Sequence, residues 1–73
     1  MYTRLLRKSL HTKTFTIRRH SSSGWHVLEQ EDSRVILAVW YRDWHRVERA
    51  AQTFAGKAKS LVERGWTERA SAS

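Results

Sequence analysis

Residues 38–50 read AVWYRDWHRVERA, and they contain the point at which the hydrophobic pattern changes from that of a strand to that of a helix. Before Asp43, residues 35–41 are rich in β-branched and aromatic side chains, which is typical of a buried central or well-covered strand. After Asp43, apolar residues recur at steps of three and four, the period of an amphipathic helix. Asp43 suits the N-cap, because its carboxylate can accept a backbone hydrogen bond and favours the positive end of the helix dipole. The stretch therefore predicts a strand that leads almost directly into a helix.

The predicted helix has one apolar face and a recognisable end. Gly65 is placed as the residue after the C-cap, and Trp66 can fold back onto Leu61 in a Schellman motif. The small side chains on the apolar face indicate that the helix lies close against a flat sheet. The face comprises Trp44, Val47, Ala50, Ala51, Phe54, Ala55, Ala58, Leu61 and Val62.

Two further strands precede residues 34–41. Residues 14–20 (TFTIRRH) alternate, SSSG at 21–24 provides a turn, residues 25–30 (WHVLEQ) are again extended, and EDS at 31–33 is a second turn signal. The predicted fold class is α+β, a three-stranded antiparallel meander followed by one long C-terminal amphipathic helix packed on the sheet (β-β-β-α). Residues 2–12 fit an extra strand, a short helix or a loose arm. We expect a basic N-terminal segment at 1–13, the β-β-β-α domain at 14–66 and a flexible tail at 67–73.

The bulk composition limits the classes of protein to which the chain can belong. A chain of 73 residues has room for one domain, and 40% hydrophobic residues with four tryptophans is a globular composition. There is no cysteine, so disulfides and thiolate zinc sites are excluded. The longest apolar run, residues 35–41, is far too short to span a membrane, and the first residues lack the apolar core of a secretory signal. We therefore expect a cytoplasmic protein with no membrane partner.

The positive charge is concentrated at the start of the chain. Residues 1–28 contain six Lys and Arg side chains and no acid, so +6 of the net charge of +7 lies there. Such an asymmetry favours a polyanionic partner, most often nucleic acid, although it also fits a solvated arm that only aids solubility. The candidate nucleic-acid-binding residues are the cations Arg4, Arg7, Lys8, Lys13, Arg18 and Arg19, together with His26 and Trp40 as stacking groups.

The second face of the predicted sheet is also apolar. Alternation places Val35, Leu37, Val39 and Tyr41 on one side of their strand, and Ile36, Ala38 and Trp40 on the other. An exposed apolar face usually marks an interaction surface. Three occupants are open: the N-terminal leucines (Leu5, Leu6 and Leu10), a second copy or other protein partner, or nucleic acid. The predicted interaction face consists of Leu28, Ile36, Ala38 and Trp40.

The sequence supports a metal site or a catalytic site less strongly than it supports the binding of a partner. His20 with His26, and His45 with Glu48, have spacings that metal ligands sometimes use, but no metal site or cofactor is predicted. His20 and His26 beside Arg18 and Arg19 resemble the cluster of a small ribonuclease, which is the enzymatic alternative. Phosphate-binding loops and nucleophile elbows are absent from the sequence. We expect a protein that is not an enzyme.

The order of the elements resembles two groups of proteins. The residues that carry the resemblance are Trp25-His26-Val27 in a strand, then Ala50-Ala51 and Ala55 to Ala58 in the helix, within residues 14–65. One group is the arm-type DNA-binding domain of tyrosine recombinases, and the other is a set of small bacterial β-β-β-α proteins. The resemblance implies a sheet packed on a helix, with DNA read by the sheet. The apolar second face departs from the recombinase pattern, whose DNA-facing side is polar and basic.

Overall fold

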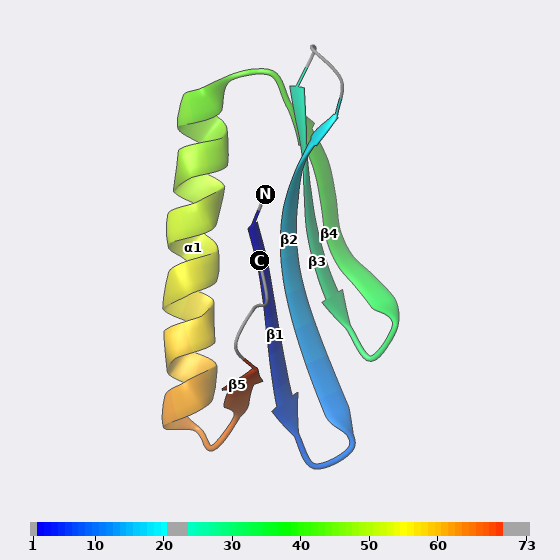
Figure 1. The fold of residues 1–73 in the computed structure, drawn as a ribbon, viewed down its shortest axis with the longest axis vertical. Coiled ribbons are helices and arrows are strands. Elements are labelled where there is room, and N and C mark those ends of the chain that lie inside the picture. Colours follow the sequence, from blue (N-terminus) through cyan, green and yellow to red (C-terminus); the bar gives the residue numbers. More distant parts are fainter. Residues whose placement is uncertain (1, 21–23, 70–73) are drawn as a thin grey trace.

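A computed structural model describes residues 2–20 and 24–69 of the chain. Residues 21–23 of the predicted turn at 21–24 and the last part of the predicted tail, 70–73, lie outside the described residues. Six elements follow one another: β1 (Tyr2–Lys8), β2 (His11–His20), β3 (Gly24–Glu31), β4 (Arg34–Tyr41), α1 (Trp44–Glu63) and β5 (Thr67–Arg69). The α+β class is confirmed, with one helix on one face of an antiparallel sheet (Figure 1).

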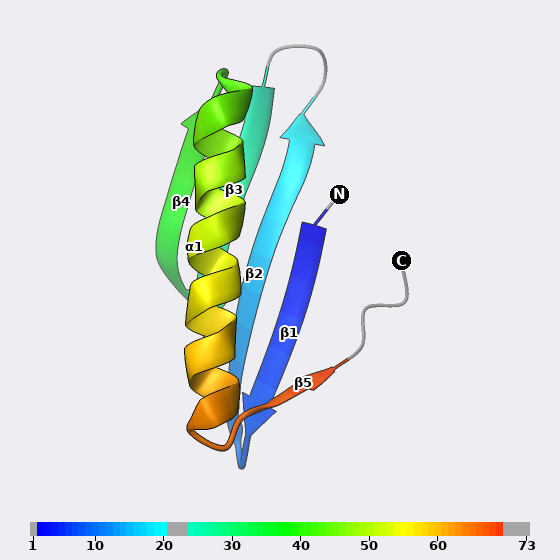
Figure 2. The ribbon, with the colours of Figure 1, turned by 90° about the vertical axis from the view of Figure 1, so that its left-hand side faces the viewer.

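The sheet has five strands in the order β4-β3-β2-β1-β5, so the predicted three-stranded meander was incomplete. Residues 2–8 are a full strand that pairs antiparallel with β2 from Tyr2↔Ile17 to Lys8↔His11. Residues 67–69, which we expected in a flexible tail, pair antiparallel with β1 as β5. Both additions extend the sheet on the same side, and Figure 2 shows them on the side away from β4.

Tight turns with positive φ join β1 to β2 and β3 to β4. Asp32 and Ser33 form a two-residue connection between β3 and β4, with φ of 50° and 70°, the type I′ geometry that suits the twist of a hairpin. The Asp32 carboxylate also accepts a hydrogen bond of 2.8 Å from the backbone N–H of Thr12. The turn is therefore held against the start of β2 as well as by its own strands.

The predicted ends of the helix are confirmed. The Asp43 carboxylate accepts a hydrogen bond of 3.0 Å from the backbone N–H of His45. At the other end, Gly65 has φ of 100°, its N–H donates to the Val62 carbonyl at 3.1 Å, and the Trp66 N–H donates to the Leu61 carbonyl at 3.0 Å. This pair of bonds is the Schellman motif. Within the parts of the chain that the structure describes, no helix combines the length and apolar character needed to cross a membrane.

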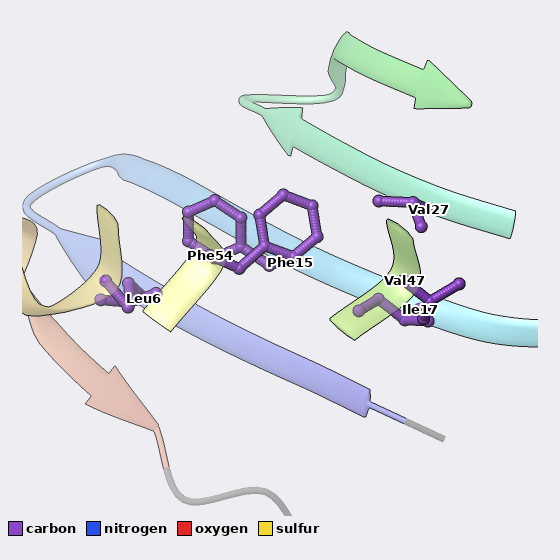
Figure 3. Close-up of a cluster of buried hydrophobic side chains, with 7 residues drawn as sticks. Leu6, Phe15, Ile17, Val27, Val47 and Phe54 are labelled. Atoms are coloured by element: carbon purple, nitrogen blue, oxygen red, sulfur yellow. The ribbon is translucent and has the colours of Figure 1, made fainter. Parts of the chain in front are cut away.

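The core lies between α1 and the face of the sheet that it covers. Phe15 of β2 and Phe54 of α1 are buried with ring centroids 4.7 Å apart, and Figure 3 shows them at the centre of the cluster. Trp44 and Val62, which we predicted on the apolar face of the helix, are about half exposed. The buried apolar residues are Leu6, Phe15, Ile17, Val27, Val47, Phe54 and Ala58.

The strand at residues 34–41 is the edge of the sheet, so the prediction of a buried central or well-covered strand was wrong. Val35 is 57% exposed and Leu37 is 37% exposed. The apolar core residues of the sheet come from β1, β2 and β3 instead. Because the four strands follow one another as a meander, the last of them ends at the rim, while β1 makes β2 an inner strand.

A β-bulge in β4 decides which side chains face the helix. Glu31 pairs with Arg34 and Gln30 with Val35, but Glu29 pairs with Leu37, so Ile36 is the extra residue. Val35 therefore shares the face of Gln30 rather than that of Leu37, which corrects the prediction from simple alternation. Beyond the bulge, the predicted split holds, with Leu37, Val39 and Tyr41 on the helix side and Ala38 and Trp40 on the other.

Candidate nucleic-acid interface

The face of the sheet opposite α1 is uncovered by any element that the structure describes (Figure 1). We call it the open face. Its residues follow from the register, because directly paired residues share a face. From the rim of β4 inwards they include Val35, Ala38, Trp40, His26, Leu28, Arg18, His20, Thr16, Leu5 and Arg7.

Trp40 lies between two histidines on the open face. The imidazole of His26 stacks on the indole with ring centroids 4.6 Å apart and an interplanar angle of 20°. His20 meets the same indole edge-on at 4.8 Å and 87°. Trp40 remains 57% exposed, so part of the indole is still accessible. Three separate strands thus build one aromatic surface, which we call the His-Trp-His cluster (His20, His26 and Trp40).

The bulge is the reason that this cluster exists. A two-residue turn with an unbroken ladder would pair Trp40 with Trp25, on the helix side of the sheet. The extra residue shifts the register by one, so that Trp40 pairs with His26 and Trp25 pairs with Tyr41. A shift of one residue moves every following side chain to the opposite face.

Arg18 adds a charge beside the cluster. It pairs with His26 in the β2–β3 ladder and is exposed on the open face. No ion pair joins Arg18 to a described residue. Arg7 is also on this face, exposed, at the far end of β1. The open face thus combines exposed aromatic rings with guanidinium groups that have no ion-pair partner among the described residues.

Three of the predicted phosphate-binding cations are engaged in the fold. Arg4 forms a two-pronged ion pair with Glu68 of β5, at 2.5 and 2.6 Å, and this pairing raises the pKa of Arg4 and lowers that of Glu68. Lys8 donates a hydrogen bond of 2.9 Å to the backbone carbonyl of Arg64, just beyond the C-terminus of α1. Lys13 lies 2.8 Å from Glu29. The charge asymmetry of the sequence therefore overstates the number of cations available to a partner.

The remaining predicted cation, Arg19, lies on the other side of the sheet. It lines a hollow with Trp25 and Trp44 at the N-terminal end of α1, where these two indole rings are 5.2 Å apart. Arg18 and Arg19 therefore face opposite sides of β2, as neighbouring strand residues must. Of the eight predicted nucleic-acid-binding residues, the structure brings Arg18, His26 and Trp40 together.

Three of the four residues of the predicted interaction face (Leu28, Ala38 and Trp40) lie on the open face, whereas Ile36 is the bulged residue and has no partner in the ladder. Leu28 pairs with Ala38, one step along the strands from the pair of His26 and Trp40. Ile36 is 47% exposed, and Leu28 is half-buried between its neighbours. Leu28 and Ala38 form an apolar strip that runs from the His-Trp-His cluster towards the bulge.

One proposed occupant of this strip is excluded. Leu6 is fully buried in the core on the helix side, and Leu10 is 92% exposed in the β1–β2 turn. Leu5 is a residue of β1, where its side chain lies on the open face beside Thr14 and not over the strip on β3 and β4. The N-terminal leucines therefore do not fold over the open face, because their segment is a strand of the same sheet.

Metal and acid–base chemistry have no further support from the geometry. In residues 2–20 and 24–69 there is no group of three or more His, Cys, Asp or Glu side chains that could hold a metal ion. His20 and His26 both lie against Trp40 rather than on either side of an open pocket. The small-ribonuclease alternative stays a prediction.

His20 is the site residue that sequence reasoning missed as a stacking group. The signal was available in part, since a β2–β3 hairpin around Ser21–Gly24 places His20 near the open end of the ladder, on the face of Arg18. No pattern in the sequence indicated the bulge that brings Trp40 next to His20.

In comparisons with known proteins, no family model, no curated protein and no solved structure matches this chain. The resemblance to recombinase arm-type domains stays a prediction.

Proposed function

We propose that this protein is a small, non-enzymatic nucleic-acid-binding protein that uses the open face. The observation that carries the proposal is Trp40, more than half exposed, stacked on His26 and placed beside Arg18. Exposed aromatic rings on a sheet offer platforms for unpaired bases, and neighbouring guanidinium groups hold the phosphates between them. Bases inside a duplex cannot reach such a platform, so the proposal favours single-stranded DNA or RNA.

The contact set is smaller than the sequence alone suggests. Arg4, Lys8 and Lys13 are excluded as primary contacts because each already has a partner within the fold. Arg7 and Arg18 remain on the open face, near its two ends. A strand of nucleic acid that runs from Arg7 over Thr16 to Arg18 would reach the His-Trp-His cluster directly beyond Arg18.

A fluorescence titration with a single-stranded oligonucleotide tests this proposal. With about two phosphate contacts, from Arg7 and Arg18, the logarithm of the binding constant should fall with the logarithm of salt concentration with a slope of roughly −1.4. Replacement of Trp40 by leucine should weaken binding about tenfold or more, since base stacking on one aromatic side chain contributes about 1–3 kcal/mol. Arg18→Ala should lower both the affinity and the slope.

Lys59→Ala is the matched control, because Lys59 is an exposed cation on the helix and lies away from the open face. The affinity of the Lys59→Ala variant for the oligonucleotide, and the salt dependence of that affinity, should stay close to those of the unsubstituted protein. The proposal is overturned if no oligonucleotide binds at low ionic strength. It is equally overturned if Trp40→Leu and Lys59→Ala weaken binding to the same small extent.

The second candidate function is a protein-interaction module, and one observation favours it. The apolar strip of Leu28 and Ala38 continues from Trp40 across the open face towards the bulge, which would let two copies pack sheet against sheet as a homodimer. Sedimentation equilibrium distinguishes the two candidates. A dimer that dissociates on replacement of Ala38 by lysine would support the module, whereas a monomer at all concentrations would exclude the homodimer.

A further inference from the structure

The outer edge of β4, the last strand of the sheet, is apolar and has no strand paired with it among the described residues. A strand edge presents a row of unpaired N–H and C=O groups, and proteins normally protect such edges with charge, proline or short length. Here, between Arg34 and Arg42, every side chain is apolar or aromatic. An edge of this kind is a template for an additional strand.

A groove runs between this edge and the helix. Leu37 and Tyr41 of β4 line one wall, and Ala50 and Phe54 of α1 line the other. Arg46 and Arg49 stand at its rim, both exposed and neither in an ion pair with a described residue. Figure 2 shows α1 in front of the sheet with β4 beside it on the outer side. Thr53 and Lys57 complete the lining, and the Lys57 ammonium pairs with Glu29. The groove therefore combines apolar side chains with polar ones and is basic along its rim.

The bulge sets the limit of the edge that a new strand can use. It interrupts the ladder between Val35 and Leu37, and a bulge twists an edge away from further pairing. From Leu37 to Tyr41 the register is regular. This regular stretch is also the part of β4 that lines the groove, so that one segment of a partner could pair with the edge and fill the groove together.

The positive charge of the groove rim distinguishes between three possible partners of the β4 edge: a second copy of the chain, nucleic acid and an acidic peptide. If a second copy paired antiparallel with β4 edge to edge, both helices would lie on the same face of one continuous sheet. Each copy would then bring Arg46 and Arg49 towards those of the other, and like charges oppose that approach. Nucleic acid offers phosphates for the rim but no ladder of N–H and C=O groups for the edge. An extended peptide with carboxylates provides both the N–H and C=O groups that the edge requires and the negative charges that suit the arginines of the rim.

We propose that the edge of β4 from Leu37 to Tyr41 binds an extended acidic segment of a partner protein as an added β-strand. Every second side chain of that segment faces the groove, where an apolar side chain packs against Leu37 and Ala50 and flanking carboxylates pair with Arg46 and Arg49. This interaction uses the helix side of β4. It is therefore separate from the open face and does not depend on the nucleic-acid proposal.

Amide-shift mapping on the full ¹⁵N-labelled chain tests the proposal. The probe is the blocked peptide Thr-Glu-Thr-Val-Thr-Glu-Thr, whose three alternate non-threonine positions match Leu37, Val39 and Tyr41 of β4. The peptide should shift the backbone amides of residues 37–41 and slow their exchange with solvent. The double variant Arg46→Glu/Arg49→Glu should weaken binding about fivefold, since exposed ion pairs contribute modestly.

Two controls make the outcome decisive. The peptide Thr-Lys-Thr-Val-Thr-Lys-Thr has the same strand propensity with the opposite charge, and it should bind the unchanged chain more weakly than the acidic peptide. Arg18→Glu alters a cation on the open face and should leave the peptide affinity unchanged. Both arginines of the rim are exposed, so their replacement should not unfold the protein, and the amide spectrum verifies this.

Each of the following results would overturn the proposal. The acidic peptide at millimolar concentration shifts no amide of residues 37–41, or the two peptides bind equally well. The same amides shift on concentration of the protein alone, which would assign the edge to a second copy. A single-stranded oligonucleotide displaces the peptide from the edge, which would assign the groove to nucleic acid.

Discussion

Replacement of Glu29 by glutamine should be among the most destabilising single changes in this protein. Glu29 is 2% exposed, and its two carboxylate oxygens lie 2.8 Å from Lys13 and 2.9 Å from Lys57. These contacts join β3 to β2 and β3 to α1. The glutamine variant keeps the shape of the side chain but leaves Lys13, which is itself largely buried, without its principal counterion.

The magnitude follows from the burial of the group. Removal of one partner from a buried ion pair costs about 3–5 kcal/mol of the free energy of unfolding. Lys57 is about half exposed and Lys13 also reaches Glu31 at 3.3 Å, so the lower end applies, about 3 kcal/mol. A chain of 73 residues has a free energy of unfolding of roughly 4–11 kcal/mol, so the loss is a large fraction of the total.

Urea denaturation followed by tryptophan fluorescence measures the effect, and pH provides an independent signature. Burial alone would raise the pKa of the Glu29 carboxyl, but hydrogen bonds and charges from Lys13 and Lys57 outweigh it and hold the pKa below its ordinary value. Because the folded-state pKa is lowered, the stabilisation is complete above the ordinary pKa and is lost as the pH falls through the lowered one. Glu29→Gln should remove this part of the acid dependence.

Glu48→Gln is the matched control, because Glu48 is exposed on α1 and forms no ion pair with a described residue. It should change the free energy of unfolding by less than about 0.5 kcal/mol. If Glu29→Gln is equally mild, and its acid dependence matches that of the unchanged chain, the reasoning about the buried carboxylate is refuted.

Further predictions concern stability and can be measured by the same denaturation experiment. Gly24→Ala should cost about 2 kcal/mol or more, because φ is 156° and a Cβ would lie 2.7 Å from the Tyr41 carbonyl oxygen. Gly56→Ala should instead stabilise by about 1 kcal/mol, since it lies within α1 and a Cβ there meets no atom within 4 Å; destabilisation would contradict this. Asp43→Ala should cost about 1 kcal/mol through loss of the N-cap bond, and Asp43→Asn should restore most of it. Phe54→Ala should cost about 3–5 kcal/mol through the cavity left beside the core, and a loss below 1 kcal/mol would place the core elsewhere.

The parts of the fold that the sequence predicted well are those held by local interactions. The helix begins after Asp43 and ends before Gly65 because both caps are formed by residues within a few positions of the ends. The segments at β2, β3 and β4 were recognised from alternation and turn residues. The strand β5 was not, because three residues carry too little pattern to reveal a strand that exists only through its pairing with β1.

The candidate site was predictable in its residue types but not in its assembly. Arg18, His26 and Trp40 were all named from the sequence, and the structure brings them together. Arg4 was named beside them, yet it pairs with Glu68, which lies 64 positions away in the chain. Pairs of this kind are fixed by the order of strands, which no local pattern specifies.

The sequence by itself determined where the strand pattern stops and the helix begins, because caps, periodicity and turn chemistry act over a few residues. Tertiary structure alone decided that the most apolar strand lies at the edge of the sheet, since that depends on which strands its neighbours pair with. It also decided the face of Trp40, because a single bulged residue in β4 reverses every side chain that follows. Local free energies select the elements, whereas the register and order of the strands depend on contacts between residues that are far apart in the chain.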